Sequence, residues 1–389
     1  MKPVKILSVD DEADLELLLT QYFRRKIRKG EYEFFFAHNG VEALTVLLKE
    51  KDIDIILSDI NMPEMDGLTL LTKVNEMHNP ALKCIMVSAY GDMGNIRSAM
   101  NNGAFDFATK PIDLDDLALT IEKAVEQIEY IKRMEREHSQ LESIKTDLAV
   151  AGEIQQAILP RVFPPFPENE RELDLAALMT PAKDVGGDFY DFFRIDPQRI
   201  GVVVADVSGK GVPAAIFMAV SRTLLRTIGL QGDAPGDCIK RSNELLVSES
   251  VNCMFVTVFY AIYNVVTGEV NYCNAGHNPP FLLKADGTVS MQPISTNCIV
   301  GAIDGLDYAE GTLQLSVGDT LLMYTDGVNE AFNEQHQQYG EQRMEQLLTT
   351  QAGSTCRELI DAQLADVHQF AGDEPQSDDI TLLAIKRKA

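Results

Sequence analysis

The sequence predicts a doubly wound α/β domain, a long helical linker and an α+β sandwich, in that order. The first third alternates short apolar runs with helical patterns, the middle is one helical pattern, and the last part groups strands into hairpins. A chain of 389 residues is long for one hydrophobic core, so several domains are expected. We place the first domain at 1–125, the linker at 117–159, overlapping the last helix of that domain, and the last domain at 160–389.

The first domain contains five short apolar runs that we expect to be strands, separated by segments of helical period such as 14–27 and 40–49. Five strands that alternate with helices are typical of a parallel, flavodoxin-like sheet, which binds its ligand outside the carboxyl ends of the strands. The five predicted strands are Lys5–Val9, Tyr32–Ala37, Ile53–Ser58, Lys83–Ser88 and Phe105–Thr109.

The linker has no internal proline, and its one glycine is Gly152. Its apolar residues recur every three or four positions, which favours a coiled coil of roughly four to five heptads between two copies of the chain. A single amphipathic helix lying along a domain is the alternative. The seam, interrupted at Glu135 and His138, contains Ile121, Val125, Ile128, Ile131, Met134, Leu141, Ile144 and Leu148.

The last domain is expected to be an α+β sandwich, because its strands form hairpins and its helices are grouped. Its predicted strands are Leu173–Met179, Phe189–Ile195, Gly201–Ala205, Phe255–Asn264, Glu269–Asn274, Pro280–Leu283, Thr320–Thr325 and Ile380–Ile385. Its predicted helices are Pro213–Ile228, Pro235–Ser248, Gly340–Thr349 and Thr355–Phe370.

Composition limits the classes of partner. The net charge of −25 disfavours binding to nucleic acid or to an anionic membrane, either of which needs a basic surface. The six cysteines are scattered without a Cys-x-x-Cys pair, which indicates reduced core residues. The N-terminus reads as a strand and no apolar run approaches 18 residues, so we expect a cytoplasmic protein.

Polar residues end four of the five strands of the first domain. Asp10 and Asp11 follow the first strand, Asp59 the third, Ser88 ends the fourth and Lys110 follows the fifth. Three carboxylates at one sheet edge can hold Mg²⁺, with one of them, Asp59, attacking a phosphoryl group. A single aspartate in such a place is more often a helix cap or turn residue, but the combination predicts a phosphorylation site.

Four further aspartates follow or precede apolar strands in the last domain: Asp188, Asp206, Asp326 and Asp378. Carboxylates gathered at a sheet edge repel one another unless a cation lies between them. Oxygen ligands without Cys or His suit Mg²⁺ or Mn²⁺, and two such ions can position a hydroxide for attack on a phosphate ester. The sequence therefore predicts phosphoester hydrolysis.

The first domain resembles the receiver domain of two-component response regulators. The resemblance rests on Asp10-Asp11, Asp59-Ile-Asn-Met-Pro-Glu-Met-Asp-Gly67, Ser88-Ala89 and Lys110-Pro111. It implies a Mg²⁺-dependent transfer of phosphate from a sensor histidine kinase to Asp59. It also implies that Ser88 and Phe107 are the hydroxyl and aromatic residues that switch on phosphorylation.

The last domain resembles the SpoIIE-like branch of the metal-dependent serine/threonine protein phosphatases. The motifs are Gly152-Glu-Ile-Gln-Gln-Ala-Ile-Leu-Pro160, Asp184-Val-Gly-Gly-Asp-Phe-Tyr-Asp191, Asp206-Val-Ser-Gly-Lys-Gly-Val-Pro-Ala-Ala215, Phe255-Val-Thr-Val-Phe-Tyr260, Asn274-Ala-Gly-His-Asn-Pro-Pro280, Tyr324-Thr-Asp-Gly327 and Ser377-Asp-Asp-Ile-Thr381. The match implies that Asp206 bridges two Mn²⁺ or Mg²⁺ ions, with the Val207 carbonyl as a further ligand. Asp188 would bind one ion, and Asp326 and Asp378 the other.

The roles of three nearby residues stay open. Asp379 is the less favoured ligand of its pair. Lys210 can attract the phosphate or be an exposed turn lysine without a role. His277 can be a general acid, although we favour a turn histidine that holds its loop. Asp191 is expected to bond nearby backbone.

Together the resemblances imply a response regulator whose effector dephosphorylates phosphoserine or phosphothreonine on a protein, typically an anti-sigma factor antagonist. Phosphorylation of Asp59 would control this activity through the helical linker of a homodimer. A non-catalytic binding switch that sequesters a partner is the main alternative. A transcription factor is disfavoured by the acidity, and a phosphatase of small metabolites is the third alternative.

Overall fold

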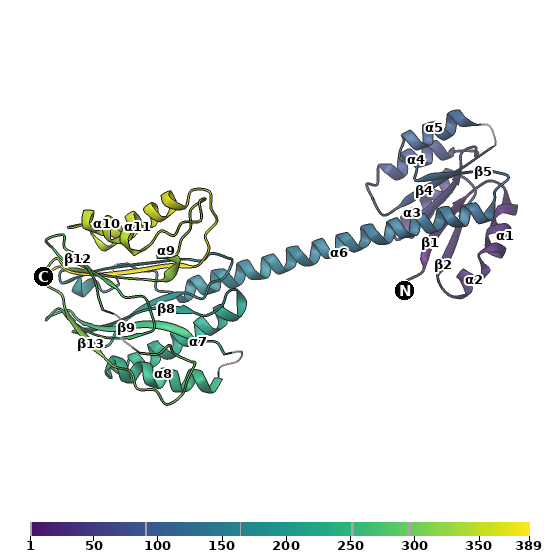
Figure 1. The fold of residues 1–389 in the computed structure, drawn as a ribbon. Helices are drawn as coiled ribbons and strands as arrows, with labels where there is room; N and C mark the ends of the chain where they lie inside the picture. Colours follow the sequence, from purple (N-terminus) through teal and green to yellow (C-terminus); the bar gives the residue numbers. More distant parts are fainter. Residues whose placement is uncertain (1, 90–91, 164, 250–252, 294–296) are drawn as a thin grey trace. The chain divides into compact units, whose positions relative to one another are not determined.

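The computed structural model describes residues 2–89, 92–163, 165–249, 253–293 and 297–389. They divide into two compact units, Met1–Ser143 and Ile144–Ala389 (Figure 1). One helix, α6 (Leu114–Ile158), begins in the first unit and ends in the second. Each unit has its own hydrophobic core, so each is described by itself.

The first unit contains one five-stranded parallel sheet with the order β2-β1-β3-β4-β5, which confirms the doubly wound fold. Its strands are β1 (Val4–Val9), β2 (Tyr32–Ala37), β3 (Ile55–Asp59), β4 (Lys83–Ala89) and β5 (Asp106–Lys110). Its helices before α6 are α1 (Ala13–Tyr22), α2 (Arg24–Arg28), α3 (Gly40–Lys49), α4 (Gly67–Asn75) and α5 (Met93–Asn101).

The segment 14–27, expected as one helix, is two short helices separated at Phe23. The backbone of Phe23 leaves helical geometry with ψ of 8°. Its ring is buried against Tyr32 and Phe34 of β2, with ring centroids 5.8 and 5.5 Å away. Packing of this aromatic residue on the sheet therefore overrides the local helical pattern, which a periodicity argument does not detect.

The apolar residues of the predicted seam lie in two environments along helix α6, one buried and one exposed. Ile121 and Ile128 are buried in the core of the first unit. In contrast, Met134, Leu141 and Ile144 are 48%, 57% and 55% exposed. The first heptads thus stabilise the first unit, and only the later apolar residues of the seam remain on the surface, where pairing between copies stays a prediction.

The second unit contains two five-stranded antiparallel sheets with helices on both outer faces, which confirms the αββα sandwich. One sheet has the order β13-β10-β9-β8-β7, with β7 (Phe189–Arg194), β8 (Arg199–Val207), β9 (Val256–Asn264), β10 (Glu269–Ala275) and β13 (Gly311–Gln314). The other has the order β12-β11-β14-β15-β6, with β6 (Leu173–Thr180), β11 (Phe281–Leu283), β12 (Val289–Met291), β14 (Thr320–Tyr324) and β15 (Ile380–Arg387). The helices are α7 (Val212–Gly229), α8 (Pro235–Glu249), α9 (Asp326–Asn329), α10 (Glu341–Thr350) and α11 (Cys356–Ala371), with the short 3₁₀ helix η1 (Pro167–Asn169).

The two faces of the second sheet have different apolar partners. Leu321 and Leu383 belong to the core that includes the first sheet, α7 and α8. Leu322 and Leu382, one position away in each strand, pack with residues of α10 and α11. Because successive side chains in a strand point to opposite faces, the neighbouring strands β14 and β15 contribute to both apolar layers.

The strands β12 and β13 were not among the predicted strands. Both lie at sheet edges, and their residues are half-buried or exposed. Neither has the apolar run that marks a buried strand, so only the pairing with β11 and β10 defines them.

Among the described helices, α7 is the one that is long and apolar enough to span a membrane. Its residues Met218, Leu225 and Ile228 are buried in the core of the second unit, as in the core helix of a globular sandwich.

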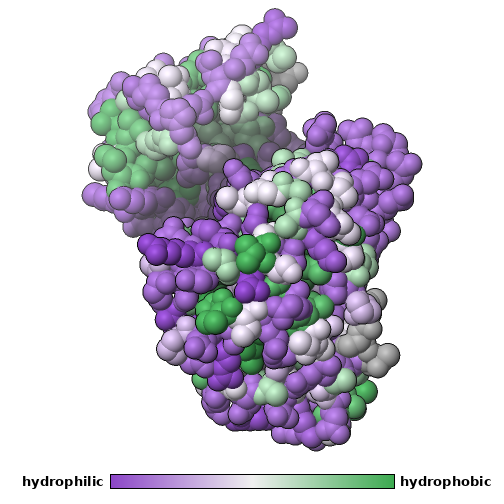
Figure 2. Space-filling model, turned by 90° about the vertical axis from the view of Figure 1, so that its left-hand side faces the viewer, coloured by the Kyte–Doolittle hydropathy of each residue, from purple (hydrophilic) through white to green (hydrophobic). Residues whose placement is uncertain are grey.

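The face of the molecule in Figure 2 is mainly hydrophilic with separate hydrophobic patches, in keeping with 24% charged residues.

We predict that Leu322→Ala lowers the free energy of unfolding of the second unit by about 3 kcal/mol, because it leaves a cavity where a fully buried side chain packs. Leu245→Ala removes a leucine that is 47% exposed and serves as the matched control, with an expected change within about 0.5 kcal/mol. Chemical denaturation followed by circular dichroism measures both. Equal effects would contradict the assignment of Leu322 to the core.

Candidate active site

The first unit gathers acidic residues at the carboxyl edge of its sheet. Asp10 directly follows β1, and Asp59 is the last residue of β3. Lys110 ends β5, and its Nζ lies 2.6 Å from Asp59 Oδ2 and 3.0 Å from Asp10 Oδ2. Oxygens of Asp10, Asp11 and Asp59 lie within 4.8 Å of one another. The strand ends thus bring the predicted residues together.

The chemistry of this cluster fits a hard cation and a phosphoryl group. Burial raises the pKa of Asp10. Burial acts to lower the pKa of Lys110, but hydrogen bonds to Asp59, Asp10 and Glu12 outweigh it and raise that pKa. The buried Ser88 Oγ has no hydrogen-bond partner among the described residues. A Mg²⁺ ion among the carboxylates and a phosphoryl oxygen at Ser88 would satisfy these groups.

In the second unit, the strand ends bring two carboxylates of the first sheet together. Asp188 precedes β7, and Asp206 lies near the end of β8. Phe189 pairs with Ala205 in this antiparallel hairpin, so the next residues outward, Asp188 and Asp206, are neighbours at one edge.

The second sheet places three more carboxylates at its own edge. Tyr324, the last residue of β14, pairs with Leu382 of β15. Asp326 therefore follows one strand at the edge where Asp378 and Asp379 precede the other. Residues more than 180 positions apart in the sequence are in this way brought to one site.

Asp379 joins the edges of the two sheets through backbone hydrogen bonds. Its Oδ1 accepts from the Ala182 N–H at 2.8 Å, and its Oδ2 accepts from the Gly187 N–H at 2.6 Å. A Cβ on Gly186 would lie 2.3 Å from Asp379 Oδ2, so this close approach requires glycine. The Asp379 carboxylate therefore bonds backbone on both oxygens. The Asp378 carboxylate contacts the Lys210 ammonium at 2.7 Å and accepts from the Asp379 N–H at 2.9 Å.

Burial and mutual repulsion raise the pKa values of Asp188, Asp206 and Asp326. Burial, followed by repulsion from Asp206 and Asp379, raises the pKa of Asp188 well above its usual value. Burial, followed by repulsion from Asp326 and Asp378, raises the pKa of Asp206 to about 7. Burial and Asp378 likewise raise the pKa of Asp326. A bound cation would reverse this effect by stabilising the ionised carboxylates.

The donor set of the second unit, with carboxylate oxygens at two sheet edges, fits hard divalent cations. The buried Asp188 Oδ2 accepts no hydrogen bond from the described residues, as expected of an oxygen that binds a cation. Of the residues that the structure describes, only the triad of the first unit has three acidic ligand atoms within 4.8 Å of one another.

Comparison with known proteins identifies both units. The model of the response regulator receiver domain matches residues 6–122, and the model of stage II sporulation protein E (SpoIIE) matches residues 196–388. Sporulation initiation phosphotransferase F of Bacillus subtilis is 33% identical over 119 residues, which cover 31% of this chain and 91% of that protein. The chain is a response-regulator receiver joined to a SpoIIE-type phosphatase domain.

Further relatives agree with this membership. Phosphoserine phosphatase RsbU of Bacillus subtilis is 28% identical over 247 residues, which cover 64% of this chain and 72% of RsbU. The SiaA-PP2C domain of Pseudomonas aeruginosa shares the fold of the second unit, with a TM-score of 0.55, 23% identity, and coverage of 64% of this chain and 98% of that one. The enzyme is a serine/threonine protein phosphatase. Phosphatases of the SpoIIE type are metal-dependent.

His277 lies within the phosphatase fold as a buried loop residue. Its Nδ1 is 2.8 Å from Thr257 Oγ1, and its backbone N–H donates to Asn274 Oδ1 at 2.8 Å. Burial lowers the pKa of His277 to about 4, so the ring is neutral at pH 7. A neutral, enclosed imidazole favours the loop-holding role over general acid catalysis.

Two residues of the α6 end reach the loop that carries Asp188, a role that the sequence did not reveal. The buried Gln155 donates from Nε2 to the Gly186 carbonyl at 2.6 Å and accepts from the Gly186 N–H at 2.9 Å. A Cβ on Gly152 would lie 2.2 Å from the Asp184 carbonyl oxygen, so helix and loop are in close contact. The lone glycine of a long helix was the available signal.

Asp191 pairs mainly with charged side chains, and not only with backbone as expected. Its carboxylate accepts from the Phe192 N–H at 2.8 Å, but it also contacts Arg226 at 2.6 Å and Arg222 at 3.2 Å. Asp191 is 1% exposed, so these arginines compensate a buried charge. The arginines lie one helical turn apart on α7, a spacing visible in the sequence without its partner.

We predict that the phosphatase domain loses stability on acidification partly through His277. The folded-state pKa of about 4 lies below the unfolded value of 6.5, so the unfolded chain binds more protons between these values. The contribution is fully present above pH 6.5 and falls by about 3 kcal/mol as the pH drops to 4. Denaturation of wild type and His277→Gln across this range measures it. Parallel pH profiles for the two proteins would contradict the assignment.

Proposed function

We propose that this response regulator removes phosphate from phosphoserine or phosphothreonine on a protein substrate, an anti-sigma factor antagonist, under control of phosphorylation at Asp59. The observation that carries the proposal is the meeting of five carboxylates at adjoining edges of two sheets, with Asp379 held by backbone and the others left for cations. The similarity to phosphoserine phosphatase RsbU supports the substrate class.

Each carboxylate receives a role within this proposal. Asp206, with the Val207 carbonyl, would bridge two Mn²⁺ or Mg²⁺ ions; Asp188 would hold one of them. Asp326 and Asp378 would hold the other. Asp379 would position the Gly186-Gly187 loop through the hydrogen bonds described above and would not bind an ion itself. The receiver would bind Mg²⁺ through Asp10, Asp11 and Asp59.

Hydrolysis would proceed by direct attack of water on phosphorus. The bound ions would supply a water of lowered pKa and would stabilise charge on the phosphoryl oxygens. Lys210 lies next to Asp378 at the rim of the site, where its ammonium can attract the incoming phosphate. His277, neutral and enclosed, would keep the Thr257 side of the site rigid and would not donate the proton to the leaving oxygen.

Helix α6 supplies a route for control by the receiver. Its first turns belong to the receiver core, through Leu117 and Ile121, and its last turns bond the Gly186 backbone through Gln155. Gly186 is two residues from Asp188, so a rotation or shift of this helix would move a metal ligand. Phosphorylation of Asp59 would set the position of the helix, in a homodimer paired through the exposed residues Met134, Leu141 and Ile144.

The remaining partners follow from the two families. A sensor histidine kinase would donate phosphate to Asp59 in the cytoplasm, and the phosphatase would meet its substrate protein there. The non-catalytic binding switch is the competing function. It is less well supported, because none of the four principal ligand carboxylates is replaced by another residue.

We predict that wild-type protein releases phosphate from a phosphoserine protein in the presence of Mn²⁺, and that Asp206→Asn reduces this rate by roughly 100-fold or more. Beryllofluoride, which mimics phosphorylation, should change the wild-type rate. Asp59→Ala should remove that response while leaving Mn²⁺ binding at the phosphatase site intact. No release under any of these conditions would favour the binding switch instead.

Gln155→Ala should raise the Mn²⁺ concentration needed for half-maximal activity by about tenfold, because it removes two hydrogen bonds that hold the Gly186 loop. Gln140→Ala changes an exposed glutamine of the same helix and is the matched control. Titration of Mn²⁺ against initial rates measures the shift. An unchanged Mn²⁺ dependence would argue against control through this contact.

A further inference from the structure

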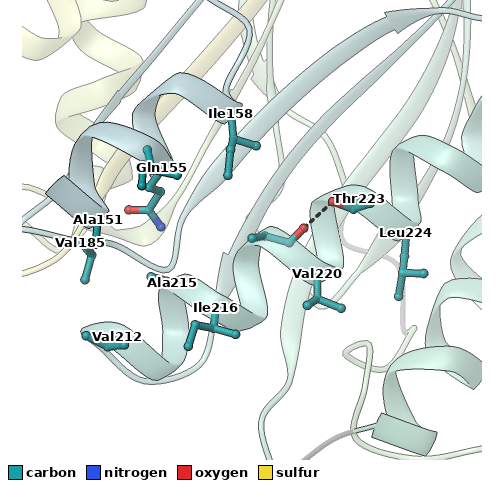
Figure 3. A pocket seen from close by; sticks show the side chains of 12 residues that line it. Ala151, Gln155, Ile158, Val185, Val212, Ala215, Ile216, Val220, Thr223 and Leu224 are labelled. Atoms are coloured by element: carbon teal, nitrogen blue, oxygen red, sulfur yellow. Dashed lines mark hydrogen bonds between the residues drawn. The ribbon is translucent and has the colours of Figure 1, made fainter. Parts of the chain in front are cut away.

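Two adjoining cavities lie along α7 in the phosphatase domain. The first is an apolar groove of about 590 Å³ between the end of α6 and α7. Val185 and Val212, close to the metal-binding carboxylates in sequence, lie at one end, and Ile158 and Leu224 lie at the other (Figure 3). Ile154 and Ile216 of this groove are 59% and 62% exposed.

The second cavity, of about 380 Å³, shares Ile158 with the groove and is lined by four arginines, Arg161, Arg194, Arg222 and Arg226. Two carboxylates contact them: Asp191 contacts Arg222 and Arg226, and Glu168 contacts Arg194. Four guanidinium charges against two carboxylates leave a local charge of about +2 in a chain whose net charge is −25. This cavity is therefore a basic site in an acidic protein.

The arginines retain hydrogen-bond donors without acceptors. The Nε atoms of Arg194 and Arg222 are buried and have no partner among the described residues. A buried donor left unpaired is unfavourable, and a guanidinium has five N–H groups suited to a planar oxyanion. Arg161 uses its Nε to bond the Gln156 carbonyl at 2.7 Å, which fixes it beside the cavity.

Aromatic rings hold two of these guanidinium groups in place. Arg226 lies over Phe193 and Arg194 over Phe166, with 5.5 and 5.6 Å from guanidinium carbon to ring centroid. Contacts of this kind reduce the freedom of the side chains before a ligand arrives. The site is thus arranged for an anion and is not a loose surface cluster.

We propose that the arginine cavity binds a carboxylate side chain of the substrate protein, while apolar residues of the same substrate segment lie in the groove. The inference rests on the proposed phosphatase function. Charge favours an acidic group in the cavity, and the adjoining apolar groove favours a protein segment over free phosphate. Because Arg194 follows Asp188 by six residues in β7, roughly 20 Å separates the cavity from the catalytic carboxylates. A segment of about six extended residues spans that distance.

The test compares two fluorescein-labelled phosphoserine peptides that differ at one feature. Both peptides carry leucines at the third and fourth residues from the phosphoserine on each side. At the sixth and seventh residues from the phosphoserine on each side, one peptide carries glutamates and the other carries glutamines. We expect the glutamate peptide to have a KM about tenfold lower with wild-type enzyme and Mn²⁺, with kcat similar. Arg161→Gln/Arg194→Gln should abolish this difference and leave hydrolysis of p-nitrophenyl phosphate unchanged. Arg171→Gln, at an exposed arginine outside the cavity, should preserve it.

The outcomes separate the docking proposal from the phosphatase proposal. Equal KM values for the two peptides with wild type, or equal losses on peptide and p-nitrophenyl phosphate in the double variant, would overturn docking alone. Absence of all hydrolysis would refute the phosphatase function, and fluorescence anisotropy without Mn²⁺ would then decide whether the cavity still prefers the glutamate peptide. The cavity would instead be a site for free anions if wild type binds inorganic phosphate, the double variant does not, and wild type shows no preference for the glutamate peptide. That result would overturn docking.

Discussion

The phosphatase site depends on one carboxylate that accepts hydrogen bonds from the backbone of a distant loop. Asp379 accepts hydrogen bonds from the backbone N–H groups of Ala182 and Gly187, and so joins the start of β15 to the loop before β7. The first strand belongs to one sheet and the second to the other. Without this link, nothing in the strand pairing would hold the edges of the two sheets, and hence Asp188 and Asp378, at a fixed separation.

The same arrangement makes the site electrostatically unfavourable on its own. Buried carboxylates that raise one another's pKa stabilise the fold little unless opposite charge is added. Lys210 supplies positive charge at the margin, beside Asp378. The centre of the site is left to divalent cations, so cation binding and closure of the two sheet edges are expected to be coupled.

Much of this organisation could be predicted from the sequence, because the functional residues lie at the ends of apolar strands. Asp10, Asp59 and Lys110 needed only the rule that parallel strands share a carboxyl edge. The sequence could not reveal the role of Asp379, because it depends on a contact with a loop nearly 200 residues away. The link from Gln155 to Gly186 was hidden for the same reason. The edge strands β12 and β13 were not predicted because their residues lack an apolar pattern.

The continuity of α6 has a consequence for how such proteins can be recombined. Leu117 and Ile121, near the start of this 45-residue helix, belong to the core of the first unit, and Gln155, near its end, bonds Gly186 within the second. Leu141 and Ile144, between these ends, are exposed and belong to neither core. Exchange of the receiver for another sensory module is therefore expected to succeed at a junction in this exposed stretch, because the contacts at both ends of the helix stay intact.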